Sequence, residues 1–221
     1  MEISFNTKPA VSLMSASFAG EVVDELNEHI EDELIDAMEN AKGPIKFSHT
    51  IDYVGKMFGD YICRLGNTYM ENTNKDVVTD QNMSDFNQSI SGREHLKYDL
   101  KVKDMGVQRI FSDTIEQGAT TADLSCILYL KVPDQVAGMV EVPGWGMIDD
   151  GKAGETTEGY THLSWGQPSE NELLKPATDQ YLRPEVGRML IFPSWVNYVI
   201  LPFSGEGELR VLTSSVIVKE K

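Results

Sequence analysis

The feature that most constrains the fold is a change in hydrophobic period partway along the chain. From Phe18 to about Lys42, apolar residues recur at steps of three and four among acidic residues, which predicts an amphipathic helix ended by Gly43-Pro44. The same period over 51–69 predicts a second helix. From Leu96 onward the period is two, which is typical of β-strands. The sequence therefore predicts N-terminal helices followed by a mainly β remainder.

The β remainder consists of short apolar segments separated by Gly and Pro turns. Strands are predicted over 96–102, 107–115, 124–132, 139–142, 188–193, 196–201 and 208–218. The segment 124–132 is almost continuously apolar, which predicts a strand buried on both faces. No strand can be placed between Pro143 and Arg183, a stretch rich in Gly, Thr and acidic residues. Helices followed by a run of strands predict an α+β protein, in which a sandwich, jelly roll or barrel carries helices on one side.

The length of the chain sets its organisation. Its 221 residues suffice for one well-filled domain, and 41% of them are hydrophobic, which favours a sizeable core. We expect an N-terminal helical region over 1–75, a polar connection over 76–93 and a β domain over 94–221, together forming one compact unit.

Charge and cysteine content exclude several classes of function. The chain has 19 Lys and Arg against 35 Asp and Glu, a net charge of −16 that opposes binding to nucleic acid or to an anionic membrane. The sequence shows neither a leader pattern nor an uninterrupted apolar stretch long enough to span a bilayer, so a cytoplasmic protein is expected. Cys63 and Cys126 have the spacing of neither a disulfide framework nor a zinc site.

The C-terminal segment 183–215 resembles the end of the 2-oxoglutarate/Fe(II) oxygenase superfamily, and more closely the short oxygenase-like proteins of marine bacteria and tailed phages. The positions that match the family pattern are Pro184, Gly187, Phe192, Pro193, Ser194, Pro202 and Arg210. A second match is Leu124–Pro133, which is similar to a family strand with the pattern Leu-Ser-Gly-Val-Tyr-Tyr-Leu-x-x-Pro. The two segments cover less than a third of the chain.

The resemblance implies a double-stranded β-helix, a cupin-like jelly roll whose two sheets face each other around a cleft. In active members the cleft holds Fe(II) on two histidines and often a carboxylate, and an arginine of the last strand binds 2-oxoglutarate. Arg210 matches that arginine. An alternative interpretation is a solvent-facing strand arginine that pairs with Glu206 or Glu208.

The iron-binding histidines of the family are missing from this sequence. The distal histidine falls on Tyr198, and the proximal pair falls on Gln117 and Ala119 or on Thr121 and Asp123. The chain has four histidines, none of them between 96 and 161: His29, His49, His95 and His162. We therefore expect neither a metal ligand set nor a cofactor. If iron does bind, Asp123 and His162 are the fallback ligands.

Three further residues are candidates for lining a ligand pocket beside Arg210. Tyr129 and Tyr198 can donate hydroxyl groups to a ligand, although aromatic residues on buried strands commonly fill a core. Asp123 opens a buried strand, where a turn residue is as reasonable as a ligand.

Three functional hypotheses follow. The first is an oxygenase-like jelly-roll protein that has lost Fe(II) binding and acts as a non-catalytic binding or assembly module, with a phage-encoded accessory protein as a specific case. The second is an active dioxygenase with non-standard ligands that uses 2-oxoglutarate and Fe(II). The third is a structural component of a phage capsid or tail, which would place the chain in the virion. The expected partner is an unidentified small molecule or protein, and a homo-oligomer would cover the edge strands.

Overall fold

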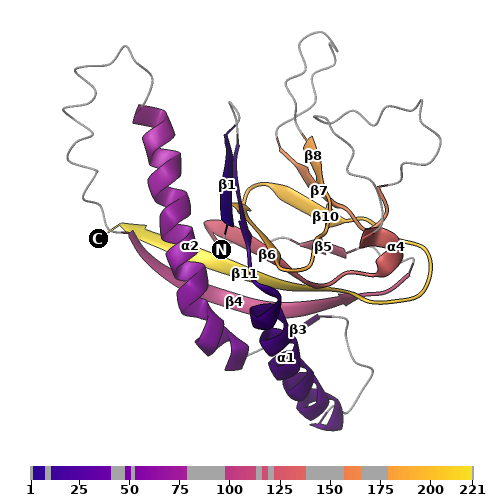
Figure 1. Cartoon of the computed structure of the whole chain (residues 1–221). Coiled ribbons are helices and arrows are strands. Elements are labelled where there is room, and N and C mark those ends of the chain that lie inside the picture. Colours follow the sequence, from indigo (N-terminus) through magenta and orange to yellow (C-terminus); the bar gives the residue numbers. More distant parts are fainter. Residues whose placement is uncertain are drawn as a thin grey trace, which may run out of the picture.

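The computed structural model describes residues 2–7, 11–40, 48–50, 53–78, 98–112, 116–118, 122–137, 157–165 and 179–220. These residues form three layers, in which two helices cover one face of a large antiparallel sheet and a small sheet covers its other face (Figure 1). No helix in these ranges is long and apolar enough to cross a membrane.

The elements in chain order are β1 (Glu2–Thr7), β2 (Ser12–Ser17), α1 (Gly20–Asn40), β3 (Ser48–Thr50), α2 (Tyr53–Val78), β4 (Tyr98–Ile110), β5 (Glu116–Gly118), β6 (Leu124–Lys131), α4 (Asp134–Ala137), β7 (Thr161–Ser164), β8 (Asp179–Leu182), β9 (Arg188–Pro193), β10 (Asn197–Ile200) and β11 (Leu209–Glu220).

The strands from β4 to β11 belong almost alternately to the large sheet and to the small sheet. The large sheet has the order β1-β2-β9-β6-β11-β4-β3, and the small sheet has the order β5-β10-β7-β8. From β4 onward the chain passes repeatedly from one sheet to the other, and all neighbouring strands are antiparallel. The last strand, β11, lies inside the large sheet, between β4 and β6.

Two apolar cores lie on opposite faces of the large sheet. The first joins the helices to the sheet and includes Leu26 of α1, Ile62 of α2 and Leu128 of β6. The second fills the space between the sheets and includes Ile127 of β6 and Leu163 of β7. All seven residues from Leu124 to Leu130 are buried, because successive side chains of β6 enter the two cores in turn. The prediction of a strand buried on both faces is confirmed.

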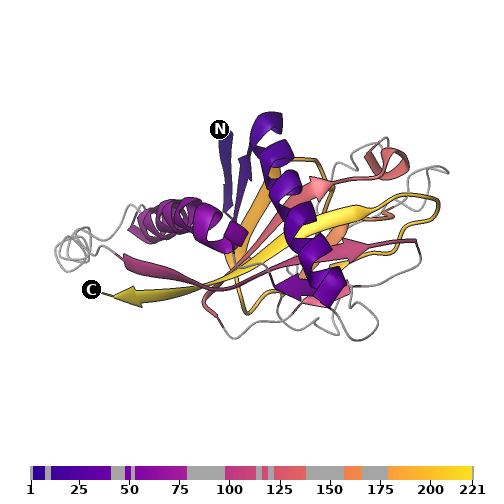
Figure 2. The ribbon, with the colours of Figure 1, turned by 90° about the horizontal axis from the view of Figure 1, so that it is seen from below.

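The helices follow the predicted apolar periodicity. In α1, the buried residues Val23, Leu26 and Ile30 recur at three- and four-residue steps and face the large sheet, whereas the acidic residues between them face outward. Figure 2 shows α1 lying across the large sheet. The helices thus pack on the β part of the same chain.

Two differences from the sequence-based expectation concern strands. β1 and β2 extend the large sheet at its edge, although the first seventeen residues gave no strand prediction; β1 pairs with β2, and β2 pairs with β9. β7 and β8 occupy part of the stretch 143–183 in which no strand could be placed. The strand predicted over 139–142 and most of the polar connection, from residue 79, lie outside the described residues.

A tight backbone contact at Gly187 fixes the junction between β2, α1 and β9. Gly187 has φ +83°, its N–H donates to the carbonyl of Tyr129 at 2.9 Å, and its own carbonyl accepts from the N–H of Phe18 at 2.8 Å. A Cβ at this position would lie 2.7 Å from the carbonyl oxygen of Phe18. Both the dihedral angle and the available space therefore require glycine.

We expect Gly187→Ala to lower the free energy of unfolding by about 2 kcal/mol, because it combines a left-handed backbone with a clash against backbone. Gly20→Ala is the matched control, since a Cβ there meets no atom within 4 Å and Gly20 begins a helix, where alanine is tolerated. Urea unfolding followed by circular dichroism measures both. Equal stability of the two variants would contradict this account of the junction.

Candidate functional site

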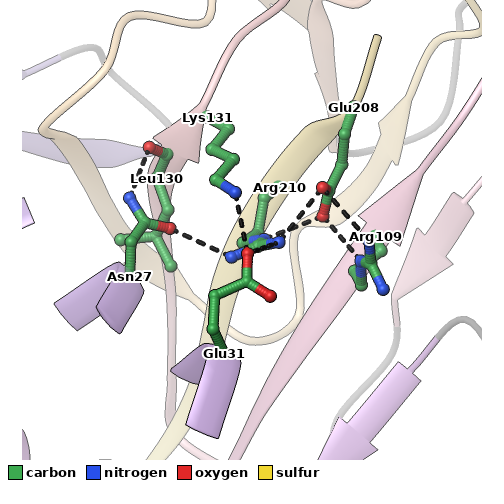
Figure 3. Close-up of polar contacts among 7 residues, drawn as sticks. All are labelled: Asn27, Glu31, Arg109, Leu130, Lys131, Glu208 and Arg210. Carbon is green, nitrogen blue, oxygen red and sulfur yellow. Dashed lines mark hydrogen bonds and ion pairs between the residues drawn. The ribbon is translucent and has the colours of Figure 1, made fainter. Parts of the chain in front are cut away.

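Arg210 is the only charged residue among the described ones that is fully buried. It is the second residue of β11, and its neighbours Leu209 and Val211 belong to the core between the sheets. Because side chains alternate along a strand, Arg210 projects to the opposite face, toward α1 (Figure 3). The arginine that the sequence singled out therefore faces the helix layer rather than the space between the sheets.

Four hydrogen bonds hold the guanidinium in place. Nε donates to Oε1 of Glu208 at 2.8 Å and Nη2 donates to Oε2 of the same carboxylate at 3.0 Å, a bidentate geometry. Nη2 also donates to Oε1 of Glu31 at 2.7 Å, and Nη1 donates to Oδ1 of Asn27 at 3.3 Å. The side-chain amide of Asn27 in turn donates to the carbonyl of Leu130 at 3.1 Å. The pairing with Glu208 was one of the two that the sequence suggested, but Arg210 is not solvent-facing.

Arg210 lies in the middle of a row of three cations across three neighbouring strands. The register places Arg109 of β4 opposite Arg210 on one side and Lys131 of β6 opposite it on the other, where a register shift follows Arg210. Like charges directly opposite each other repel. Two carboxylates separate them: Arg109 Nε donates to Glu208 at 2.7 Å, and Lys131 Nζ donates to Glu31 at 2.9 Å.

The cations lower the pKa of both carboxyl groups. Hydrogen bonding to Lys131 and Arg210, together with their charges, outweighs desolvation and lowers the pKa of Glu31 from 4.5 to about 2. Burial raises the pKa of Glu208, but the hydrogen bonds and charges of Arg109 and Arg210 outweigh it, so the net shift is downward. Both carboxylates are therefore ionised at neutral pH. The cluster then holds three positive charges and two negative charges.

The sequence did not single out four of these residues: Asn27, Glu31, Arg109 and Lys131. Glu31 is one of the acidic residues that alternate with the apolar ones in α1, a pattern that is typical of a solvated helix face. The available signal was the position of Asn27 and Glu31, four residues apart and next to the apolar stripe of Leu26 and Ile30. That spacing shows that the two side chains share an edge of the helix, but it does not show what they meet.

The two candidate tyrosines lie in the core between the sheets, away from Arg210. The hydroxyl of Tyr129 and Oγ1 of Thr161 are 2.6 Å apart and buried, so this hydrogen bond joins β6 of the large sheet to β7 of the small sheet. Burial raises the pKa of Tyr129 to about 12. Tyr198 packs edge-on against Phe192, with ring centroids 5.9 Å apart. The core-filling interpretation describes both side chains.

Asp123 and His162 have separate surroundings. Oδ2 of Asp123 accepts a hydrogen bond from the N–H of Val218 at 2.8 Å, which ties the start of β6 to the end of β11. His162 stacks on Tyr181 at 4.4 Å between ring centroids, and its Nε2 lies 3.3 Å from Oδ2 of Asp179. His162 alternates along β7 with the buried Thr161 and Leu163, so it faces the outside of the small sheet. These contacts do not bring Asp123 and His162 together.

The Fe(II) and 2-oxoglutarate that the resemblance implies do not fit the described residues. Within those residues, no three His, Cys, Asp or Glu side chains are grouped so as to hold a metal ion. The register places Gly118 of β5 opposite Tyr198, so neither position of this pair supplies an imidazole. The donors of Arg210 that a dicarboxylate would need are directed at protein acceptors.

No protein-family model and no curated protein matches the sequence. Solved structures that resemble this one include a Pseudomonas putida prolyl-4-hydroxylase, with 13% identity and a TM-score of 0.47 over 93% of this chain and 92% of that one. A viral collagen prolyl hydroxylase from Paramecium Bursaria Chlorella virus-1 has 12% identity and a TM-score of 0.41 over 92% and 89% of the two chains. An oxidoreductase of the 2OG-Fe(II) oxygenase family from Burkholderia pseudomallei has 8% identity and a TM-score of 0.34 over 66% of this chain, which spans 57% of that protein.

These proteins are members of the 2OG-Fe(II) oxygenase family, the family that the C-terminal segment of the sequence resembles. TM-scores below 0.5 describe a loose overlap of the chains, so the likeness carries no conclusion about activity. What the site can do follows from its own contacts.

We expect Arg210→Met to lower the free energy of unfolding by about 3 kcal/mol, because it removes a buried cation and four hydrogen bonds while each carboxylate keeps one other cation. Lys131→Met is the matched control. Its side chain is 40% exposed, so the loss should be about 1 kcal/mol or less. Denaturant unfolding of both variants measures the difference, and comparable losses would show that burial of Arg210 is not decisive.

We expect the stabilisation by Glu31 to disappear in acid. The pKa of Glu31 is lower in the folded chain than in the unfolded one, so its contribution is fully present above about pH 4.5 and is lost as the pH falls toward 2. The stability difference between the wild type and Glu31→Gln should be about 1 kcal/mol at pH 7, since the side chain is 43% exposed and its charge is partly screened. It should be close to zero near pH 2. A difference that is constant with pH would contradict the charge pairing.

Proposed function

We propose that this chain is an oxygenase-like jelly-roll protein that binds neither Fe(II) nor 2-oxoglutarate and acts as a non-catalytic binding or assembly module. The observation that carries the proposal is the environment of Arg210. Its guanidinium is fully buried and its donors bind Glu208, Glu31 and Asn27, on the face of the sheet that the helices cover.

The strand order supports a jelly roll. The eight strands from β4 to β11 give the orders β4-β11-β6-β9 and β5-β10-β7-β8 in the two sheets, with every neighbouring pair antiparallel. Two facing antiparallel sheets wound in this manner are the pattern of a double-sheet jelly roll. In this description β1, β2 and β3 are additions at the two edges of the large sheet.

The loss of metal binding is supported by the residue at the distal ligand position. Tyr198 is 7% exposed and packs among apolar side chains of the core between the sheets. Fe(II) in the facial arrangement needs two imidazoles and a carboxylate with open positions for its substrates. A phenol packed against Phe192 supplies none of these.

A dicarboxylate ligand would have to compete with the protein's own carboxylates. Glu208 binds Arg210 through two hydrogen bonds and lies only two residues away on the same strand, so its effective concentration is high. Glu31 takes a further donor from α1. Arg210 is therefore a structural cation in this proposal, rather than a ligand arginine.

A role in binding another macromolecule is supported by exposed aromatic side chains. Trp195 lies in the turn between β9 and β10 and is 59% exposed, and Tyr61 of α2 is 56% exposed. Tryptophan and tyrosine are enriched in protein interfaces, where a few such side chains contribute most of the binding energy.

The test is a metal and ligand analysis of untagged protein. We expect mass spectrometry to find no stoichiometric iron, manganese or cobalt, and calorimetric titration with 2-oxoglutarate to show no binding with or without added Fe(II). Incubation with 2-oxoglutarate, Fe(II) and O₂ should release no succinate. One metal ion per chain together with 2-oxoglutarate binding would overturn the proposal.

Two histidine variants make a positive result interpretable. If iron binds through the fallback ligands, His162→Ala abolishes loading while His29→Ala, on the helix α1, leaves it intact. If both variants load iron like the wild type, the ligands lie elsewhere in the chain. Either result identifies an iron site and contradicts the non-catalytic assignment.

A further inference from the structure

We propose that two copies of this chain associate through the outer edges of their β1 strands, which pair antiparallel about a two-fold axis at Phe5. β1 ends the large sheet beyond β2, and no other described strand pairs with its outer edge (Figure 2). The large sheets of the two copies then form one continuous sheet. This association does not depend on whether Fe(II) binds, so it and the proposed function can fail separately.

Two hydrogen bonds at the ends of β2 show in which direction its backbone groups point. The N–H of Phe18 donates to the carbonyl of Gly187 at 2.8 Å, so it points toward β9. The carbonyl of Ser12 accepts from the hydroxyl of Tyr69 at 3.0 Å, so it is bound by α2 rather than by β1. Backbone groups in an antiparallel strand point alternately to its two sides. The even-numbered residues of β2 therefore point away from β1, and the odd-numbered residues point toward it.

The register then determines which backbone groups of β1 face outward. Every odd-numbered residue of β2 lies opposite an even-numbered residue of β1, as in the pair of Ser4 with Ser15. These pairs exchange the hydrogen bonds between the two strands. The N–H and C=O groups of the odd-numbered residues Ile3, Phe5 and Thr7 consequently point away from β2, and no described strand provides partners for them.

The three outward positions of β1 are complementary to a second copy of themselves. A two-fold axis at Phe5 places this residue opposite Phe5 of the partner subunit, and it places Ile3 opposite Thr7 of the partner subunit. Each such pair exchanges two N–H···O=C hydrogen bonds in an antiparallel ladder. Every outward backbone group of the three residues thereby gains a partner in a single register.

A second long edge in the described residues carries features that prevent pairing, whereas β1 lacks them. β3 pairs with β4 only at residues 106–108, so the stretch 98–105 of β4 has no strand partner on that side among the described residues. This stretch contains the exposed Lys101 and Lys103 and a β-bulge. Edge lysines and bulges block the addition of a further strand. β1 contains neither lysine nor proline, and its ladder with β2 has no bulge.

The distribution of charge favours a second copy as the occupant of this edge. Residues 2–17 contain one acidic residue, Glu2, and one basic residue, Lys8, so this segment is neutral in a chain whose net charge is −16. Two copies repel each other when their acidic surfaces meet, but a neutral edge avoids that repulsion. An identical edge also satisfies the outward groups of both strands at once.

Sedimentation equilibrium of the full chain tests the association. Over concentrations from about 1 to about 500 µM, we expect the mass to rise from 24.7 kDa toward twice that value. Thr7→Pro should raise the dissociation constant of the dimer about tenfold or more, because it removes an outward N–H from each copy while the donors to β2 remain. Thr7→Ala is the matched control. It keeps the N–H and should stay within about threefold of the wild type.

Amide exchange read at single residues gives a second measurement that needs no variant. Diluting the wild type about a hundredfold should accelerate exchange of the amides of Ile3, Phe5 and Thr7 about tenfold or more, because dissociation exposes them. The amides of Ser4 and Asn6 bind β2 in the monomer as well as in the dimer. Their exchange should therefore be independent of concentration.

Three outcomes would overturn the proposal. A chain that stays monomeric at the highest concentration does not use this edge for a second copy, and the edge is then left to a strand of another protein. A dimer that is as tight in Thr7→Pro as in Thr7→Ala is formed through a different surface. If odd and even positions of β1 respond equally to dilution, the outer edge of β1 is not where the copies pair.

Discussion

The arrangement of this protein depends on one buried charge, the guanidinium of Arg210. A cation inside a protein is costly unless its hydrogen bonds and its charge are both satisfied. Here Glu208, Glu31 and Asn27 satisfy them, and the first of these is on β11 while the other two are on α1. The pairing of this group, together with the burial of Val23, Leu26 and Ile30, holds α1 over the strands β4, β11 and β6 (Figure 3).

The second constraint is that the large sheet has two apolar faces. Its central strands are buried on both sides, so one layer must cover each face. The small sheet covers one face and the helices cover the other (Figure 1). Without the helices, the apolar side chains on that face of the large sheet would be exposed.

Residues with short-range or purely apolar roles were the most predictable. The pairing of Arg210 with Glu208 follows from a spacing of two on one strand, and the burial of Tyr129 follows from its apolar strand. The contacts of Glu31 with Arg210 and of Arg109 with Glu208 were not predictable, because they join residues about a hundred or more positions apart. His162 and Asp179 meet only because β7 and β8 pair. Neither strand is long enough to show a recognisable apolar periodicity in the sequence.

The sequence by itself determined the two helices, the strands with a strong apolar pattern and the resemblance of the C-terminal segment, since all of these depend on periodicity and local spacing. Only the tertiary structure decided the direction in which Arg210 points and which carboxylates it meets. A one-residue change in strand register sends every side chain to the other face of a sheet, and register is set by pairing with distant strands rather than by the strand's own residues. The same arginine can therefore serve a cleft or hold a helix, according to the face on which the fold places it.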